Sequence, residues 1–346
     1  MAFFGVTREI IDEVLPHPNA DKLEIGKLKD VNFRFVIPKG KYKPNDPVLY
    51  FPIDSVLPRR TAEAIGLYGK LSGKNKDRIK SLRLRGEISQ GVVAPISILP
   101  DTNETNTEKI TQVLGVTKYE PPVVPCNAGN LIALPVGLSA YDIEGAERNM
   151  DVLEQLMDIP VVVTEKLEGM NFGITRDLNG KIYVNQRNYS IEPIEDKEHD
   201  FWRVAKEKGL IELVEKIAWD YWPDSNVTLY GEFLGPAVQG NIYKLQEHTV
   251  KLFDIKVNDS YIDAIDFMEL INIDQRVPTV FSGGTLREFL KDYDDIVHAS
   301  HGVSNLNSGT FREGIVIKPE HEFRIDGYGR AIVKQRDAIY LSQSKL

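Results

Sequence analysis

The first hundred residues alternate short apolar segments with turn residues. Segments rich in β-branched or alternating apolar side chains, separated by Pro, Gly, Asn and Asp, occur at 22–28, 33–40, 47–58, 81–86 and 91–99. Five short strands within about a hundred residues predict a small barrel, and the five-stranded OB barrel is the commonest choice. A helix is expected near 60–67, capped by Thr61.

After residue 100 the amino-acid composition becomes typical of a linker between domains. A polar, Thr/Asn-rich stretch covers 101–113, and a Pro-rich stretch that contains Cys126 covers 119–130. A charged segment at 140–157 has apolar residues spaced for one buried helical face. We therefore expect an OB-like domain over 1–120, a linker and connecting helix over 121–150, and a second domain over 151–346.

From Val161 onwards strands and helices are mixed. Residues 200–222 are strongly periodic and predict one helix, and TLREFLKDY predicts a second. Strands are expected in VVVTEKLEGMNFGI (two, joined by a turn), KIYVNQR, NVTLYGEFLG, HTVKLFDIKV, REGIVIKP and GRAIVKQR. The pattern of the whole chain therefore predicts an α+β fold in which the OB-like barrel is N-terminal.

Composition narrows the class of protein. The chain has 346 residues, and its 42% hydrophobic and 27% charged fractions are typical of globular proteins. No apolar run reaches the roughly 18 residues of a membrane helix, so no membrane partner is expected. Acidic residues occur early in the N-terminal stretch, which therefore lacks the pattern of a signal peptide. One cysteine excludes an internal disulfide, which favours the cytoplasm or another reducing compartment.

Charge is distributed unevenly. The net charge of −9 argues against a nucleic-acid partner, yet residues 70–85 carry seven basic residues against the single Asp77. A surface that follows phosphates needs local positive charge. Lys80, Arg83 and Arg85 are candidates for RNA contact, and the last two flank a single strand residue and should share one face. A solvated basic loop is the plain alternative.

One lysine stands out as a candidate nucleophile. Lys166 begins the string KLEG between two apolar strands. A lysine acts as a covalent nucleophile only when neutral, so it needs burial or a nearby cation. A K-x-x-G string alone is common by chance. Here it opens an ordered series that continues with NQRN (185–188), GEF (231–233), LFDI (252–255), EGIVIK (313–318) and VKQR (333–336).

In this order and spacing the series resembles the motifs of the covalent nucleotidyltransferase superfamily, which contains polynucleotide ligases and mRNA capping enzymes. The resemblance covers the chain from about 150 onwards and implies an ATP-grasp-like nucleotidyltransferase domain of antiparallel sheets with flanking helices. It implies ATP as cofactor, with Lys166 joined covalently to AMP. It also implies Mg²⁺ or Mn²⁺, held through a carboxylate cluster of Glu168, Glu232 and Glu313.

The remaining roles follow from the same resemblance. Lys318 and Lys334 are expected at the nucleotide phosphates, and Arg187 at the nucleotide or the substrate end. Phe253 is expected to stack on adenine, and Glu165 to help read the base edge. Two departures are Glu168, where many relatives carry Asp, and Arg336, where a second lysine is common; Arg keeps the charge but differs in geometry.

The branch of the superfamily is indicated by three further strings. HPNADKLEI (17–25), FPIDSVLP (51–58) and SLRLRGEISQG (81–91) resemble RNA ligases of the Deinococcus and Naegleria type, which place an OB domain first. DNA ligases and capping enzymes place an OB domain after the last motif, and only ten residues follow Arg336. The expected partners are RNA ends or a nicked duplex, and no obligate protein partner is evident. A DNA ligase, a capping-type enzyme and a non-catalytic RNA-binding protein remain the alternatives.

Overall fold

The computed structural model describes residues 4–119, 130–135, 137–138, 140–194 and 198–343. The Pro-rich linker expected around Cys126 lies outside the described residues. The described chain divides into two compact units. The first takes in residues 4–119, 144–151 and 338–343, and the second takes in residues 130–143 and 152–337.

The first unit is built on a curled antiparallel sheet. Its strand order is β3-β2-β1-β4-β8, formed by β1 (Thr7–Pro16), β2 (Leu23–Leu28), β3 (Arg34–Pro38), β4 (Pro47–Phe51) and β8 (Val92–Pro95). Strand β1 pairs with β4 through its first half and with β2 through its second half, with a register shift between Ile11 and Glu13. Such a shift bends a strand and lets a sheet curl into a barrel. This arrangement confirms the expected OB-like fold.

Shorter elements complete the first unit. They are β5 (Ser55–Val56), which pairs with β9 (Thr117–Lys118), a hairpin of β6 (Leu82–Leu84) and β7 (Glu87–Ser89), β11 (Glu144–Gly145), α1 (Arg59–Ala64), α2 (Thr107–Leu114), α9 (Ala338–Gln343), and the 3₁₀ turns η1 (Ile96–Ile98) and η2 (Ala146–Arg148). Buried apolar side chains form two clusters, one around Phe35 and Tyr50 and one around Leu49 and Ile110.

The second unit contains two antiparallel sheets. The larger has the order β10-β15-β14-β13-β16-β17-β18, formed by β10 (Asn130–Ile132), β15 (Ser190–Glu192), β14 (Ile182–Asn185), β13 (Met170–Arg176), β16 (Val227–Leu234), β17 (Thr249–Val257) and β18 (Ser260–Tyr261). The smaller contains, in order, β23 (Val333–Arg336), β20 (Gly314–Pro319), β12 (Pro160–Lys166) and β19 (Thr279–Thr285). A short hairpin joins β21 (Arg324–Ile325) to β22 (Gly329–Arg330).

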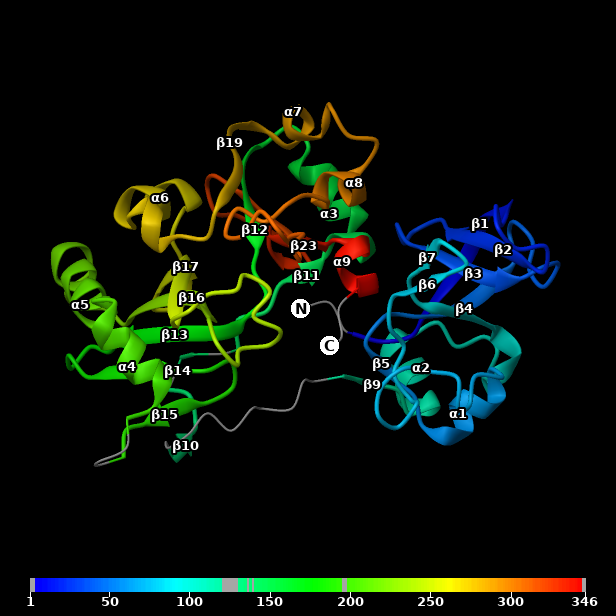
Figure 1. Cartoon of the computed structure of the whole chain (residues 1–346), viewed down its shortest axis with the longest axis horizontal. Helices are drawn as coiled ribbons and strands as arrows, with labels where there is room; N and C mark the ends of the chain where they lie inside the picture. The colour runs from blue at the N-terminus through cyan, green and yellow to red at the C-terminus, as the bar shows by residue number, and fades with distance from the viewer. Residues whose placement is uncertain (1–3, 120–129, 136, 139, 195–197, 344–346) are drawn as a thin grey trace. The chain divides into compact units, whose positions relative to one another are not determined.

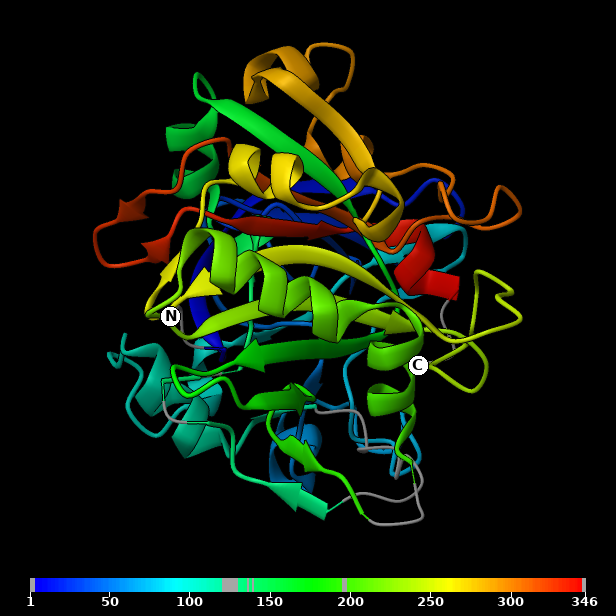
Figure 2. The ribbon, with the colours of Figure 1, turned by 90° about the vertical axis from the view of Figure 1, so that its left-hand side faces the viewer.

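Helices cover the larger sheet on one face. Helices α4 (Asp200–Glu207) and α5 (Leu210–Tyr221) pack their apolar sides on β13, β14 and β16, and Figure 2 shows them in front of these strands. Helix α6 (Ala264–Leu270) packs on β17, α7 (Leu286–Leu290) on β19 and α8 (Ile296–Ser300) on β23. The 3₁₀ turn η3 (Ile273–Gln275) lies beside β17, and α3 (Met150–Leu156) precedes β12. Within the described residues no helix has the length and apolar character needed to cross a membrane.

Several predicted elements need correction. The single helix expected over 200–222 is broken at Gly209, whose φ of 66° is the left-handed conformation that ends α4. The polar stretch 101–113 contains α2, which begins at the N-cap Asn106 and buries Ile110. Thr61 does not cap α1 but lies inside it, buried, and its hydroxyl donates to the carbonyl of Leu114 at 2.6 Å.

The helix expected over 140–157 is also mostly wrong. Only Met150–Leu156 is α-helical, and residues 140–143 have no regular secondary structure. Strand β1 was missed, because acidic side chains at Glu9, Asp12 and Glu13 interrupt its apolar pattern. Strand β19 was also not predicted, and neither were the short strands β7, β9, β10, β11, β15, β18 and β21. The longer strands β2, β4, β12, β13, β16, β17 and β20 lie where the sequence predicted them, and the α+β class with antiparallel sheets is confirmed.

Candidate active site

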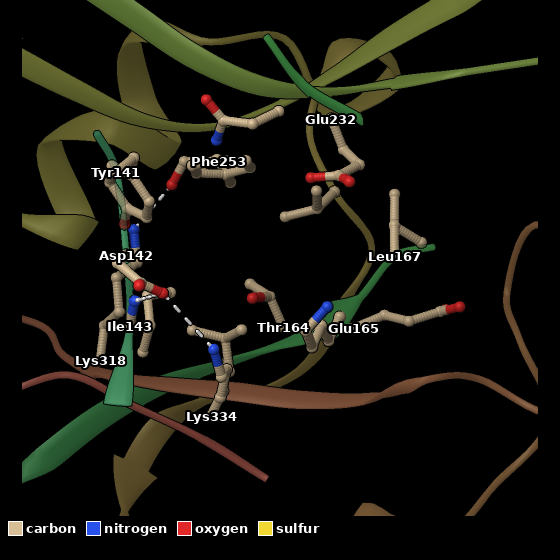
Figure 3. A pocket seen from close by; sticks show the side chains of 14 residues that line it. Tyr141, Asp142, Ile143, Thr164, Glu165, Leu167, Glu232, Phe253, Lys318 and Lys334 are labelled. Atoms are coloured by element: carbon tan, nitrogen blue, oxygen red, sulfur yellow. Dashed lines mark hydrogen bonds and ion pairs between the residues drawn. The ribbon is translucent and has the colours of Figure 1, made fainter. Parts of the chain in front are cut away.

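A pocket in the second unit is walled by both of its sheets. Strands β12 and β20 of the smaller sheet and strands β13, β16 and β17 of the larger one carry most of its lining. The pocket is lined by Tyr141, Asp142, Ile143, Thr164, Glu165, Lys166, Leu167, Asn171, Glu232, Phe253, Val277, Val316, Lys318 and Lys334 (Figure 3). Residues far apart in the sequence thus meet around one cavity, and six of them are residues that the motifs had singled out.

Lys166 is the last residue of β12, where it pairs with Gly314 of β20. Its Nζ lies 2.7 Å from Oε1 of Glu313. On the other side stands Glu232, whose pKa burial raises to about 8; the positive charge of Lys166 opposes this rise and the negative charge of Glu313 adds to it. The lysine therefore lies in the field of two carboxylates from two different sheets.

The glycine of the K-x-x-G string is required by packing. A Cβ on Gly169 would lie 2.5 Å from the carbonyl oxygen of Phe233 and 2.7 Å from Cγ of Glu232. Its backbone amide also hydrogen bonds to Glu232. Only a residue without a side chain allows the turn after β12 to lie this close to β16, and that approach brings Lys166 and Glu232 together.

Glu168 faces a different environment from the other two predicted metal ligands. Its Oε1 accepts a hydrogen bond from the amide of Gly240 at 3.0 Å, and its own amide donates to the hydroxyl of Tyr243 at 2.7 Å. In the part of the chain that the structure describes, no group of three or more His, Cys, Asp or Glu side chains could hold a metal ion. Glu232 and Glu313 face Lys166, whereas Oε1 of Glu168 is bonded to the loop after β16. The three carboxylates as joint ligands of one metal ion stay a prediction.

The predicted phosphate-binding cations lie on the side of β20 and β23. Nζ of Lys318 donates to the carbonyl of Phe253 at 2.7 Å, and burial lowers the pKa of this lysine. Nζ of Lys334 lies 3.6 Å from the carboxylate of Asp142, and a guanidinium nitrogen of Arg187 lies 2.7 Å from the same carboxylate. Asp142 therefore joins two cations from separate motifs, one on β23 and one in the turn after β14. Figure 3 shows the contact between Asp142 and Lys334.

Glu165 lines the pocket but has hydrogen-bond partners of its own. It is almost fully buried, and its carboxylate accepts from the hydroxyl of Ser304 at 2.5 Å and from the amide of Asn305 at 2.9 Å. Burial raises its pKa. Successive side chains of a strand point to opposite faces, so Lys166 and Glu165 cannot both face the same side of β12. A carboxylate has about four acceptor sites, and these two hydrogen bonds use only part of them, so a role of Glu165 at the base edge stays a prediction.

Tyr141 and Asp142 are the polar pocket residues outside every motif that have hydrogen bonds or ion pairs with motif residues. Tyr141 and Asp142 lie in the segment that was expected to be helical. The ring centroid of Tyr141 is 4.9 Å from that of the half-buried Phe253, and its hydroxyl donates to Asp254 at 2.6 Å. No motif marks these residues, and the apolar spacing of 140–157 argued for a helix, so no sequence signal identified them.

The basic residues predicted to contact RNA lie in the first unit. Arg83 is on β6 and exposed, whereas Arg85 lies past the end of β6 with a φ of 52°. The expectation that both share a strand face is therefore wrong, because Arg85 belongs to the turn. Lys80 is partly buried, and desolvation with the nearby charge of Arg78 lowers its pKa. Arg78 is itself engaged by Asp54 at 2.6 Å and by the ring of Tyr119.

Comparison with known proteins decides the family. The profile of the RNA ligase family matches residues 159–336, just over half of the chain. The chain belongs to the RNA ligase family. A family of OB-fold domains matches residues 6–96, which agrees with the first unit. No curated protein sequence matches the chain.

Solved structures of an RNA ligase from Naegleria gruberi resemble the whole chain. The complex with PPi is 25% identical, with a TM-score of 0.81 over 99% of both chains. A mutant of that ligase with ATP and Mn is 26% identical, with a TM-score of 0.79 over 99% of both chains. A further mutant with AMP and Mn gives 25% identity, 99% coverage of both chains and a TM-score of 0.81. The family profile and these structures thus agree that the chain is an RNA ligase with an OB-fold domain.

Proposed function

We propose that this ATP-dependent RNA ligase joins an RNA 3′-hydroxyl to an RNA 5′-phosphate, with Lys166 as the nucleophile. The observation that carries the proposal is the position of Lys166 in the pocket. Its Nζ lies against Glu313, and Lys318 and Lys334 line the same cavity. A lysine between carboxylates, with further cations in reach, fits attack on a phosphate ester.

In the first step, Nζ of Lys166 attacks the α-phosphorus of ATP. The bond between that phosphorus and the bridging oxygen breaks, pyrophosphate leaves, and Nζ loses a proton as the phosphoramidate forms. Before this step Lys166 must lose a first proton to solvent, because an ammonium ion has no lone pair, and that loss ends its ion pair with Glu313. We propose that Lys318 and Lys334 neutralise the charge that gathers on the phosphates.

The donor set fits a divalent metal ion. Glu232 and Glu313 face the same lysine, and the raised pKa of Glu232 marks a place where a cation is needed to keep both carboxylates ionised. Mg²⁺ is usually held by one or two carboxylates together with water and phosphate oxygens, so a third carboxylate is not required. When bound, the ion supplies positive charge beside the α-phosphate. Relatives from Naegleria bind Mn in company with ATP or AMP, which supports Mg²⁺ or Mn²⁺ here.

We propose that Phe253 and Tyr141 form the aromatic wall against which the adenine ring packs. The hydrogen bond from Tyr141 to Asp254 fixes one ring, and Lys318 fixes the backbone of the other. Arg187 and Lys334 already share the carboxylate of Asp142. Because a phosphate competes with a carboxylate for the same cations, nucleotide phosphates would compete with Asp142 for these two side chains.

The later steps use the RNA ends. An oxygen of the RNA 5′-phosphate attacks the phosphorus of lysyl-AMP, the N–P bond breaks, and Lys166 is released. The RNA 3′-hydroxyl then attacks the activated 5′-phosphate and AMP leaves, which makes the phosphodiester. We propose that Arg83 and Arg85, exposed on the first unit, bind phosphates of this RNA, and that the partly buried Lys80 contributes less.

Radioactive labelling tests the nucleophile directly. Protein incubated with ATP labelled at the α-phosphate and a divalent metal ion should retain label through denaturation, and Lys166→Ala should abolish it. Lys181→Ala, an exposed lysine on the turn between β13 and β14, is the matched control and should label normally. Full labelling of Lys166→Ala would exclude Lys166 as the acceptor of AMP.

The same assay separates the alternatives. Label from GTP in preference to ATP would indicate a capping-type enzyme. RNA binding without any labelling would indicate a non-catalytic protein. Sealing of an all-DNA nick as fast as a nick with an RNA 3′-hydroxyl end would contradict specificity for RNA.

A further inference from the structure

The conspicuous string HPNAD has no role in the nucleotide pocket, but it touches the arginine-bearing hairpin of the first unit. This hairpin consists of β6, the turn Arg85–Gly86 and β7. Its base is tied to β3, because Oγ of Ser89 accepts from the amide of Val36 at 3.0 Å and the amide of Gln90 donates to the carbonyl of Arg34. These contacts leave the turn, which presents the arginines, to be held from elsewhere.

His17 provides one of these contacts. Its Nδ1 accepts a hydrogen bond from the amide of Asn19 at 3.1 Å, so Nδ1 carries no hydrogen in this arrangement. The hydrogen of the neutral ring is then on Nε2, which lies 3.1 Å from the carbonyl of Leu84 and donates to it. His17 is only 6% exposed, so this hydrogen bond is largely shielded from water.

Asn19 provides the second contact. Its Nδ2 donates to the carbonyl of Arg85 at 3.1 Å, and a Cβ on Gly86 would lie 3.1 Å from the same nitrogen. The next carbonyl, that of Gly86, accepts from the guanidinium of Arg83 at 3.0 Å. Three successive carbonyls of the turn therefore have side-chain partners, and two of those partners come from the HPNAD loop.

The turn needs these hydrogen bonds because its backbone conformation is unfavourable. Arg85 has a φ of 52°, which a residue with a Cβ adopts only at a cost in free energy, and Gly86 has a φ of 99°. Without external hydrogen bonds such a turn populates other conformations, and the guanidinium groups would no longer be presented in one arrangement. Phosphate recognition depends on prearranged cations, since ordering them upon binding costs conformational entropy.

We infer that His17 and Asn19 are positioning residues that hold the turn Arg85–Gly86 in the conformation in which Arg83 and Arg85 bind RNA phosphates. This inference rests on the proposed RNA surface of the first unit. It gives the HPNAD loop a task in substrate binding, distinct from the nucleotide chemistry at Lys166.

Two substitutions of His17 separate its two hydrogen bonds. The asparagine of His17→Asn would retain an acceptor for the amide of residue 19, as asparagine does in Asx turns, but its side chain is too short to reach Leu84. The glutamine of His17→Gln would retain a donor that reaches further. We expect His17→Asn to weaken binding of a nicked RNA duplex by about three- to tenfold and His17→Gln to weaken it less, because one buried hydrogen bond is at stake. Asn19→Ala, at an exposed position, should weaken binding to a similar extent.

Readouts that a merely structural role would not produce complete the test. Labelling of Lys166 by ATP and the thermal midpoint should stay close to wild type in Asn19→Ala. In the Arg83→Ala/Arg85→Ala background, Asn19→Ala and His17→Asn should have no further effect on RNA affinity, because the cations they position are gone. Undiminished effects in that background, or wild-type RNA affinity in both variants, would overturn the inference.

The proposed RNA-binding surface can be tested separately from the positioning role of His17 and Asn19. If Arg83→Ala/Arg85→Ala binds the nicked duplex as tightly as wild type, the surface itself is wrong. If that double variant binds weakly while His17→Asn and Asn19→Ala bind normally, the surface stands and only the positioning role is wrong.

Discussion

At the scale of a single residue, the absence of a side chain at Gly169 allows Lys166 and Glu232 to lie close together. Gly169→Ala would place a methyl group 2.5 Å from a backbone oxygen of β16, which cannot move as a flexible side chain can. We expect labelling by ATP to fall at least tenfold, because a displacement of about 1 Å at a reacting centre can cost about a hundredfold. The rate of label incorporation measures this.

A matched glycine serves as the control for this prediction. A Cβ on Gly309 would meet only the flexible side chain of Asn307, at 3.3 Å, so Gly309→Ala should label at the wild-type rate. Normal labelling of Gly169→Ala would show that the close approach of the turn to β16 is not needed for adenylylation.

At the scale of elements, one buried carboxylate ties three strands and a loop together behind the pocket. Asp254 of β17 lies 2.7 Å from Arg330 of β22 and 3.6 Å from Lys318 of β20, and accepts from Tyr141 at 2.6 Å. Burial alone would raise its pKa, but the charges of Arg330 and Lys318, with hydrogen bonds from Arg330 and Tyr141, hold the pKa below its ordinary value.

Replacing Asp254 by Asn should destabilise the protein in a pH-dependent way. At neutral pH we expect a loss of about 3 to 5 kcal/mol, because the buried Lys318 would lose its carboxylate partner and Arg330 would keep only Glu322. A depressed carboxyl pKa stabilises the fold fully above the unfolded-state pKa of about 3.9, and this stabilisation is lost as the pH falls through the folded-state pKa. The difference between wild type and Asp254→Asn should therefore shrink towards about pH 3 in denaturant unfolding.

Asp259, exposed on the turn after β17, gives the control for charge alone. Asp259→Asn should unfold like the wild type at both pH values. A difference between wild type and Asp254→Asn that stays constant from neutral to acidic pH would contradict ionic stabilisation by Asp254.

Local pattern predicted the strands better than it predicted their boundaries with loops. Apolar alternation located β2, β4, β12, β16 and β20, because each has at least one buried face and turn residues at its ends. It failed at β1, where acidic side chains interrupt the apolar pattern, and at β19, none of whose residues is buried. It also failed over 140–149, where helical spacing occurs in a segment that contains only a two-residue strand and a 3₁₀ turn.

The candidate site could be predicted only as far as motifs mark it. Lys166, Glu232, Phe253, Lys318 and Lys334 line the pocket as the ordered motifs suggested. The partnership of Asp142 with cations 45 residues and more away depends on tertiary packing, and so does the engagement of Glu168 by the amide of Gly240.

At the scale of the whole molecule, we expect RNA binding and nucleotide chemistry to depend on different units of the chain. The pocket residues belong to the second unit, whereas Arg83 and Arg85 belong to the first. With a net charge of −9, the protein should be repelled by RNA except where local cations dominate. Affinity for RNA should then depend on few phosphate contacts, and chemistry at Lys166 should be affected little by their loss.

Salt dependence tests this division. Raising the salt concentration from about 50 to 200 mM should weaken binding of a nicked RNA duplex, because bound phosphates release counterions. Arg83→Ala/Arg85→Ala should reduce the slope of log affinity against log salt by about 1.8, roughly 0.9 for each phosphate contact removed. Lys181→Ala/Lys216→Ala, which removes two exposed lysines of the second unit, should leave the slope unchanged. If both double variants change the slope equally, the RNA is bound by diffuse charge, and the first unit has no special part in holding it.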